Sequence, residues 1–341
     1  MTDLFRTELP VLVVDDITAR PEQQQAIFDL MTGPYAELAA TRQLHLKQSL
    51  VLPPFERSGH ASQLLFVWEY PSLNALWQAR MTEESDTQLA ALWAQVNELS
   101  LRRTRRLGRP EPMQGCGREP VAPPPVAESV AAVRRILFVA PSTEIDSATQ
   151  AQWVAAATAF PGAVRSQAGF NEGYSFLLGQ MTWDISTPAT VSLDDLLAAL
   201  PTGAQLTDAI ELGETLGSGV REPQIAGIKR TILLQATPSL GADQLAALEQ
   251  TTDETPHFIT DLRNWRFSRV ARSHGTTPWT HCVEQEVFDA AVFMTSYLNH
   301  PFHWAIVDRY FHPEGHERSA VAFCHTLYPI ARSTLAEPPR R

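Results

Sequence analysis

The chain of 341 residues is predicted to be an α+β protein made of tandem β-α-β-β-α-β units with antiparallel sheets. Three observations support this prediction. The same order of apolar strands and amphipathic helices can be traced three times along the sequence. Each of these three occurrences is called a pass below. The second and third passes open on similar segments, residues 134–140 and 229–235, in which two basic residues precede an apolar run. Residues 108–128, which hold six prolines, separate the first pass from the second.

The first pass is the most complete. Its apolar alternation and helical periodicity predict the following elements: a strand at residues 10–15, a helix at 22–40, strands at 44–52 and 63–70, helices at 72–80 and 87–99, and a strand at 100–107.

The later passes follow the same order. The second predicts a strand at residues 134–140, a helix at 147–160, strands near 163–169 and 174–184, and a helix at 193–200. The third predicts a strand at 229–235, a helix at 241–251, strands at 264–271 and 279–288, a helical pair, and a strand at 319–327. The glycine-rich residues 212–219 lack the strand-before, helix-after context of a dinucleotide-binding loop, so they are interpreted as a flexible turn.

The predicted domains follow from these passes: a ferredoxin-like unit at 1–108, a proline-rich linker at 109–130, a second unit at 131–226, a third unit carrying the functional site at 227–333, and a tail at 334–341. A lone unit of this kind leaves one sheet face without helices, and that face has to be buried. We expect the second and third units to pack into one α+β barrel. The first is expected to pair with its counterpart in another subunit or to cap the assembly, which predicts a homodimer.

Composition narrows the functional classes. With 44% hydrophobic residues and a net charge of −11, the chain is that of an acidic globular protein, which disfavours nucleic acid or an anionic membrane as partner. The basic exception, arginines 102, 103, 105 and 106, is expected to be a solvated strand or a domain contact. No apolar run reaches membrane-spanning length, the first residues lack an apolar signal core, and three cysteines imply no disulfide framework. A cytoplasmic protein is expected.

The run from Tyr297 to His303 is the strongest chemical signal in the sequence. If one helix ends near Asn299 and another begins at Pro301, the proline occupies the first helical position, which suits its fixed φ. His303 then lies in the first turn, where the positive end of the helix dipole disfavours an imidazolium. A neutral histidine there is equipped to act as a base, with Tyr297 as a second proton-transfer group.

The third pass is also rich in histidine and aromatic residues. Strand alternation predicts that Trp279 and His281 point to one face, which would suit a flat organic ligand. His281–Cys282 and Cys324–His325 fall on two strands that are expected to be neighbours, and His/Cys pairs suit zinc. Adjacent strand residues point to opposite faces and the usual metal-binding spacings are absent, so no metal site is predicted.

Residues 279–303, with Thr-His on a strand and Tyr-x-x-His-Pro-x-His closing the next helix, resemble the stress-responsive A/B barrel family of the dimeric α+β barrel superfamily. The resemblance is specific over residues 279–328 and plausible from Lys229 onward. It implies a barrel that binds a small, often phenolic compound and acts without a metal or organic cofactor. The matches of Tyr297 and His303 are the catalytic pair of the family's polyketide cyclase, and the match of His281 lines its pocket.

Two further comparisons qualify this resemblance. Family members often carry a histidine on the first strand, whereas this chain has Lys229, Arg230 and Thr231, so the barrel floor is expected to offer a cation. Residues 66–80 are similar to the NIPSNAP branch of the same superfamily, which implies a NIPSNAP-like first unit.

These observations predict a cofactor-independent lyase that performs carbon–carbon bond cleavage or aldol-type or cyclase chemistry on a small phenolic or aromatic compound. His303 is the predicted base, and Tyr297 is expected to orient or protonate the developing oxyanion. The residues expected to contact the substrate are His281, His300, Arg230, Trp279 and Trp304.

Two alternatives stay open at this point. The chain would also suit a non-catalytic stress-response protein that binds a small molecule. The superfamily further includes haem-dependent enzymes, in which case His300 or His303 would be the axial ligand.

Overall fold

The computed structural model describes residues 7–55, 59–83, 86–113, 116–121 and 132–336. The chain folds into two compact units. Unit 1 comprises Met1–Gly117 and Thr295–Ser319, and unit 2 comprises Arg118–Met294 and Ala320–Arg341. The chain therefore leaves unit 2 before its last strand, contributes a segment to unit 1, and returns.

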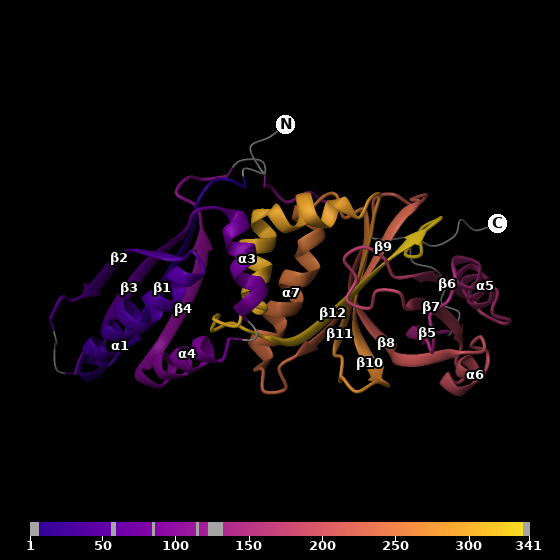
Figure 1. Ribbon diagram of the computed structural model, residues 1–341, viewed down its shortest axis with the longest axis horizontal. Helices are drawn as coiled ribbons and strands as arrows, with labels where there is room; N and C mark the ends of the chain where they lie inside the picture. Colours follow the sequence, from indigo (N-terminus) through magenta and orange to yellow (C-terminus); the bar gives the residue numbers. More distant parts are fainter. Residues whose placement is uncertain (1–6, 56–58, 84–85, 114–115, 122–131, 337–341) are drawn as a thin grey trace. The chain divides into compact units, whose positions relative to one another are not determined.

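Unit 1 contains an antiparallel sheet with the strand order β2-β3-β1-β4. Its strands are β1 (Val11–Ala19), β2 (His45–Leu52), β3 (Ser62–Tyr70) and β4 (Ser100–Gly108). Its helical segments are a 3-10 turn (Pro21–Gln23), α1 (Gln24–Leu30), a π-helix (Met31–Tyr35), α2 (Ala36–Thr41), α3 (Leu73–Glu83) and α4 (Thr87–Leu99). This is the β-α-β-β-α-β order predicted from the sequence (Figure 1).

The two central strands of the unit 1 sheet, β1 and β3, bury every second residue. Along β1, Val11, Val13, Asp15 and Ile17 are buried, while the residues that alternate with them are half-buried. The three apolar residues among them share one core with Tyr35 and Trp93 from the helical segments. Burial of alternate β-branched residues against helices is what the period-2 pattern predicts. Homodimerisation through unit 1 stays a prediction.

Buried charges tie the segment Thr295–Ser319 to this sheet. The Glu314 carboxylate accepts hydrogen bonds from Tyr35 Oη at 2.7 Å and Arg42 Nη1 at 2.9 Å, and it pairs with Arg105 Nη1 at 2.6 Å. Burial opposes ionisation of Glu314, but Arg105 and Arg42 bring its pKa below the ordinary value. The segment also contains helical turns at Phe302–Val307 and Asp308–Tyr310.

Strand β4 divides its arginines between two environments. Arg103 and Arg105 are buried, whereas Arg102 and Arg106 are exposed. Arg103 Nη1 donates to the backbone oxygen of Glu314 at 2.7 Å. The prediction of a solvated strand therefore holds for the face of β4 that carries Arg102 and Arg106. The opposite face, with Arg103 and Arg105, belongs to a buried ion-pair network.

Unit 2 contains two further β-α-β-β-α-β repeats in one sheet, ordered β12-β9-β11-β10-β8-β5-β7-β6. The first repeat consists of β5 (Ala132–Pro141), α5 (Ser147–Thr158), β6 (Arg165–Phe170), β7 (Met181–Pro188), α6 (Leu193–Ala198) and β8 (Ala204–Val220). The second consists of β9 (Gly227–Ala236), α7 (Ala242–Phe258), β10 (Asn264–Ser273), β11 (His281–Val287) and β12 (Ala320–Ile330). The π-helix that follows β11 (Phe293–Tyr297) begins in unit 2, and its residues from Thr295 onward belong to unit 1. In both repeats the first strand lies between the last and the third, as in unit 1.

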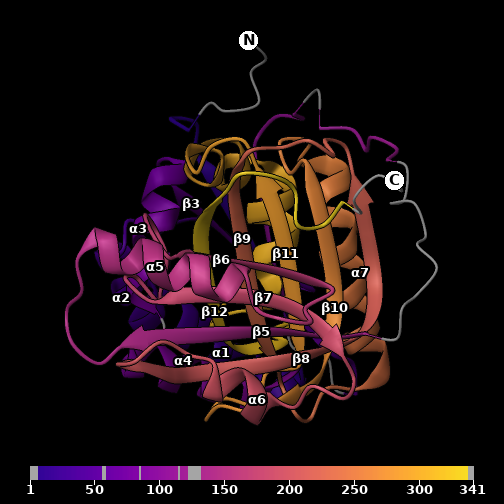
Figure 2. The same cartoon turned by 90° about the vertical axis from the view of Figure 1, so that its right-hand side faces the viewer.

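The eight-stranded sheet curls until its two edges meet. The loop after β6 donates backbone hydrogen bonds to β12, from Glu172 N to Leu327 O and from Phe176 N to His325 O, both at 2.9 Å. In Figure 2, β9, β10 and β11 run up the view while β5, β7 and β8 cross it. The second and third repeats thus form one barrel with their helices outside, which confirms the expected pairing.

A network of alternating charges lies inside this barrel. Arg134 donates to Asp184 Oδ1 at 3.0 Å and to Glu284 Oε2 at 2.6 Å, and Lys229 Nζ reaches Glu284 Oε1 at 2.6 Å and also pairs with Asp184. Burial opposes ionisation of Asp184, but Arg134 and Lys229 hold its pKa well below the ordinary range. The predicted cation on the first strand of the barrel is Lys229, which is fully buried.

The glycine-rich residues 212–219 are not a turn, because they lie within the seventeen-residue strand β8. The glycines allow close packing rather than flexibility. A Cβ at Gly219 would overlap the Trp265 indole on the neighbouring strand. Residues 174–180 are likewise not part of β7, which begins at Met181.

The boundaries of the compact units differ from those of the predicted domains in two places. The segment Thr295–Ser319, expected in the unit at 227–333, lies in unit 1 because its carboxylates pair there, Glu314 with Arg105 and Asp308 with Arg80 at 3.0 Å. Thr334 and Leu335, expected in the tail, are buried. Residues 337–341 of the tail lie outside the described residues.

The described part of the predicted linker, residues 109–113 and 116–121, has no helix or strand. Its residues 114–115 and 122–130 lie outside the described residues. The three cysteines are free thiols. Among the helices of the described ranges, none is both long enough and apolar enough to cross a membrane.

Replacing Glu314 by alanine removes the acceptor of three buried donors. We expect Glu314→Ala to lower the free energy of unfolding by about 3–5 kcal/mol, the cost of breaking a buried ion pair from one side. Urea denaturation followed by tryptophan fluorescence measures the change. Glu317→Ala, which removes a more exposed pair with Arg309, is the control and should cost at most about 1 kcal/mol. Equal losses for the two variants would contradict this account of the segment.

Candidate active site

A cavity of about 340 Å³ lies in unit 2 beside α7, where β9 ends and β11 begins. This volume falls at the lower end of the range of about 300–1,000 Å³ that is typical of small-molecule sites. Its apolar walls come from Pro238, Leu240, Leu245, Val270 and Trp279. The polar groups on its surface include His281, Thr280, Glu249 and Arg269.

His281 is the first residue of β11 and points away from the barrel interior. The same strand turns Cys282 and Glu284 inward, so alternation directs His281 toward α7. Its ring stacks on Phe267 of β10 with centroids 5.5 Å apart and planes 26° apart. The side chain is buried and fixed by packing on the strand side.

Both ring nitrogens of His281 have hydrogen-bond partners. Nε2 lies 3.1 Å from Glu249 Oε1, and Nδ1 lies 2.8 Å from Thr280 Oγ1. Burial lowers the pKa of His281, and the hydrogen bond to Glu249 only partly offsets this. The imidazole is therefore neutral at pH 7. Because a carboxylate only accepts, Nε2 carries the proton and Nδ1 accepts from the Thr280 hydroxyl.

Glu249 is held in place by Arg269. Arg269 Nε and Nη2 donate to the two carboxylate oxygens at 2.8 and 2.9 Å, and Nη1 reaches Glu214 at 2.8 Å. The hydrogen bonds from Arg269 lower the pKa of Glu249, and His281 adds to the effect. Glu249 is thus an ionised carboxylate with fixed geometry, suited to orient the imidazole and to stabilise its protonated form.

Thr280 links the hydrogen-bonded pair of His281 and Glu249 to the cavity wall and to the sheet. Thr280, His281 and Glu249 are called the relay below. The Thr280 Oγ1 accepts from Ala236 N at 2.9 Å and lies 3.0 Å from Leu234 O. The hydroxyl proton therefore has two acceptors within reach, the backbone oxygen and His281 Nδ1. Rotation of the hydroxyl between these two acceptors allows it to pass a proton to the imidazole without any movement of the backbone.

The structure brings some of the predicted ligand-binding residues together. Trp279 and His281 line the same cavity, although Trp279 precedes β11 and packs on the interior cluster around Phe138. The Trp279 Nε1 donates to Asp208 Oδ2 at 2.7 Å. Arg230 points to the face of β9 opposite to Lys229, with its guanidinium 4.8 Å from the Phe293 ring, so it does not serve as an anion anchor inside the barrel.

The predicted catalytic pair, Tyr297 and His303, lies in unit 1. The two rings are close, with centroids 4.3 Å apart and planes tilted by 50°. His303 also packs against Trp77, whose ring centroid is 5.6 Å away. Tyr297 is buried. The structure thus brings the pair together, in a packed aromatic environment, and assigns it to a different compact unit from His281.

His300 stabilises the bend between the two helical stretches. Its Nδ1 accepts from Phe302 N at 3.1 Å, and its carbonyl oxygen accepts from His303 N and Trp304 N at 2.9 and 3.2 Å. Burial lowers the pKa of His300 to about 4. These contacts describe a neutral histidine that holds the corner of the Pro301 turn.

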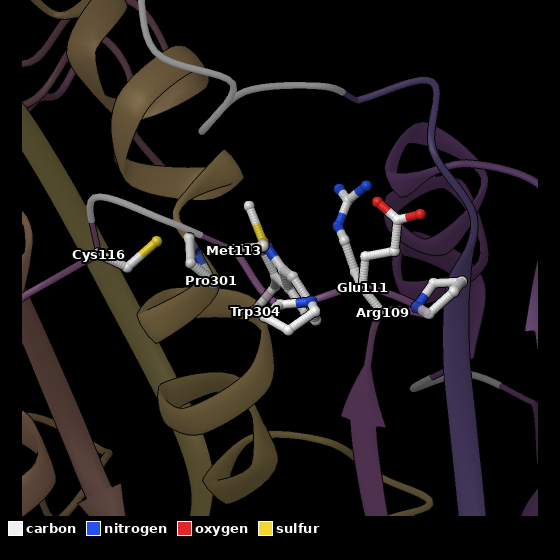
Figure 3. A pocket seen from close by; sticks show the side chains of 8 residues that line it. Arg109, Glu111, Met113, Cys116, Pro301 and Trp304 are labelled. Carbon is white, nitrogen blue, oxygen red and sulfur yellow. The ribbon is translucent and has the colours of Figure 1, made fainter.

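Trp304 contributes to a second cavity, of about 510 Å³, in unit 1 (Figure 3). Figure 3 shows Met113 beside Trp304, with Arg109 and Glu111 to one side and Cys116 to the other. The Arg109 guanidinium lies 5.6 Å from the Trp304 ring. Pro301 lines this cavity as well, but the imidazoles of the motif are not among its lining residues.

Neither a metal site nor a haem site is formed by the predicted residues. Within the described ranges, no three histidine, cysteine, aspartate or glutamate side chains gather as metal ligands. For haem, the Nδ1 of His300 accepts a hydrogen bond from Phe302 N, so the proton of the neutral ring is on Nε2 and neither nitrogen offers a lone pair to iron. Neither His300 nor His303 lines the neighbouring cavity. The arrangement does not fit an axial ligand, and the cofactor requirement of the protein stays a prediction.

Sequence reasoning missed Glu249, Arg269 and Thr280 as members of the site. Glu249 lies on a helix that the sequence predicts, but nothing in the spacing relates it to His281. Arg269 pairs directly with His281 across β10 and β11. The strand register, had it been known, would have identified Arg269 as the neighbour of that histidine.

Comparison with known proteins gives structural likeness only. No protein-family model matches the chain, and no curated protein matches it. A crystal structure of an anthrone oxidase-like protein is 12% identical, covers 64% of this chain and 100% of its own, and has a TM-score of 0.41. A mutant chlorite dismutase from Candidatus Nitrospira defluvii is 10% identical, with 59% and 92% coverage and a TM-score of 0.39. The fold assignment rests on the strand order described above, and the resemblances to the A/B barrel and NIPSNAP families stay predictions.

The low pKa of His300 predicts an acid sensitivity. Because the neutral form is favoured in the folded state, this residue contributes stability above pH 6.5 that is lost as the pH falls toward 4, by about 3 kcal/mol at most. His300→Asn keeps an acceptor for Phe302 N and removes the titration. Urea unfolding at pH 7 and pH 4.5 should show a smaller loss for His300→Asn than for the wild type. The exposed His60→Asn should behave as the wild type does, and an unchanged loss for His300→Asn would contradict the assignment.

Proposed function

We propose that the protein is an enzyme that breaks or forms a carbon–carbon bond in a small aromatic compound by acid–base chemistry at His281, with side chains alone supplying the catalysis. The observation that carries the proposal is the relay from Thr280 through His281 to Glu249 in the wall of an apolar cavity. Such a relay matches a general base that a carboxylate orients.

A retro-aldol step follows from the protonation states of the relay. A substrate hydroxyl gives its proton to Thr280 Oγ1 as the Thr280 proton moves to His281 Nδ1. The alkoxide electrons form a carbonyl, the adjacent carbon–carbon bond breaks, and its electron pair leaves with the second fragment. That fragment takes a proton back from the imidazolium through the same hydroxyl. Glu249 stabilises the imidazolium while it exists, and no oxidant is required.

The substrate class follows from the cavity walls. Trp279, Leu240 and Leu245 offer flat and branched apolar surface to an aromatic ring. Arg269 lines the same cavity and is about half exposed, although it also pairs with Glu249 and Glu214. Its guanidinium supports binding of a phenolate or a developing oxyanion, which favours phenolic compounds among aromatic ones.

The pair Tyr297–His303 remains a rival site for the same reaction, favoured by its proximity of 4.3 Å between ring centroids. We place it second because neither ring lines either of the two cavities described above. A non-catalytic role in small-molecule binding would use the same His281 cavity without turnover.

The proposal predicts the kinetic effect of removing the base. In a turnover screen over phenols and aromatic alcohols that carry a β-carbonyl or a nitrile, His281→Gln should lower kcat by about 10²–10⁴, the usual weight of general acid–base catalysis. Glu249→Gln should lower it less, because the imidazole stays in place. The exposed His45→Gln is the matched control and should leave kcat unchanged. The wild-type rate should rise with pH through an apparent pKa below 6.5, as His281 loses its proton.

Three outcomes decide between the readings. Loss of turnover in His303→Ala with full activity in His281→Gln would transfer the reaction to the predicted pair. Ligand-induced thermal stabilisation with no product for any compound would favour the binding protein. Equal activity of His281→Gln and His45→Gln on a confirmed substrate would remove His281 from the mechanism.

A further inference from the structure

Two arginines point into the barrel of unit 2 without an acidic partner. The register places Arg165 of β6 on the interior face, because the flanking Ser166 bonds to α5 through Ala157 O. Arg266 of β10 is also on that face, since Trp265 and Phe267 pack on the outer side with His257 of α7 and with His281. Both arginine side chains are half-buried.

The acidic groups of the barrel are already engaged by other residues. Asp184 and Glu284 are shared between Arg134 and Lys229. Glu286 accepts hydrogen bonds from Asn264, from Ser333 Oγ, and from Thr334 through both its backbone N and its hydroxyl. Among the residues that the structure describes, no ion pair joins Arg165 or Arg266 to any of these carboxylates.

The positive charges of Arg165 and Arg266 are therefore only partly compensated, because Asp184 and Glu284 attract them without forming an ion pair. Burial lowers the pKa of Arg266 to about 10, and repulsion from Arg134 adds to the effect. The pKa of Arg165 is lowered by the same two causes in the same order. Both side chains stay cationic at neutral pH, so each carries a charge that neither bulk water nor a neighbouring carboxylate fully stabilises.

Buried hydrogen-bonding atoms without partners surround the same cluster. Arg165 Nη2, Tyr328 Oη and Thr231 Oγ1 are shielded from solvent and have no hydrogen-bond partner. Thr231 pairs across the ladder with Glu284, and Tyr328 pairs with Lys229, so both lie on the interior face beside the charge network. Buried polar atoms are usually satisfied in folded proteins, so these three atoms are available for hydrogen bonds to a ligand.

The register brings further donors to the same place. Arg134 of β5 and Arg165 of β6 both pair with Ser186 of β7, which puts the two arginines on either side of that residue and about 10 Å apart between Cα atoms. In the β10–β11 ladder, Arg266 lies opposite Glu284, whose carboxylate forms an ion pair with Arg134. A guanidinium presents its donors in a planar fork that matches an oxyanion.

We propose that this end of the barrel binds a small oxyanion, a carboxylate or a phosphate, between Arg165 and Arg266. The ligand would supply the missing negative charge and accept hydrogen bonds from the Arg165 Nη2 donor and from neighbouring hydroxyls. The site lies on the interior face of the sheet, whereas His281 points outward toward α7, so it is distinct from the proposed active site and does not depend on it.

Inorganic phosphate, with acetate in a parallel series, is the probe. Isothermal titration of the full chain should give saturable binding of one phosphate per chain at constant ionic strength. The melting temperature should rise with phosphate beyond its rise in chloride of equal ionic strength. Arg165→Gln and Arg266→Gln should each abolish this increment. Without anion, each variant should melt at or above the wild-type temperature, because a repelled charge has been removed. The exposed Arg102→Gln should keep the full wild-type response.

The anion-free melting temperature separates a binding role from a structural one. If Arg165→Gln and Arg266→Gln melt well below the wild type without anion and keep the phosphate increment, the arginines are structural and the proposal fails. If the variants do not fold, the wild-type titration decides alone, since no saturable heat up to millimolar phosphate and acetate would overturn the proposal. A response to acetate but not to phosphate would assign the site to carboxylates.

Discussion

The buried quartet of Arg134, Asp184, Lys229 and Glu284 is the interaction on which unit 2 depends. Each cation contacts both anions, and the four side chains come from β5, β7, β9 and β11. The quartet therefore joins the two repeats across the interior of the barrel. Removing any one member would leave an uncompensated charge in a poorly hydrated space, which couples the stability of one repeat to the other.

The faces of the strands distribute the chemistry of unit 2. Inward-facing positions carry the quartet and the unpaired arginines, whereas His281 faces outward and meets Glu249 on α7. One strand, β11, thus contributes a structural carboxylate to the interior and a neutral imidazole to the cavity on its other side. Any shift of β11 by a single residue would exchange these environments, so the quartet also fixes the position of the proposed base.

Much of the fold could be predicted from the sequence because strand alternation and helical periodicity are local signals. The three repeats and most element positions follow from them. Two kinds of feature could not be predicted. Strand β8 contains three glycines, and its conformation depends on tertiary neighbours such as Trp265. The placement of Thr295–Ser319 depends on Glu314 meeting Arg105, which are more than 200 residues apart. The pairing of Glu249 with His281 similarly required the position of a helix against a sheet.

Native-state hydrogen exchange on the full chain tests most directly whether the two repeats of unit 2 form one barrel. If the quartet joins them, the slowest amides of β5 and β7 and those of β9 and β11 should exchange with the same free energy of opening. Lys229→Met should then lower both sets together. Separate opening energies for the two repeats, or a loss in Lys229→Met that is confined to β9 and its neighbours, would contradict the account.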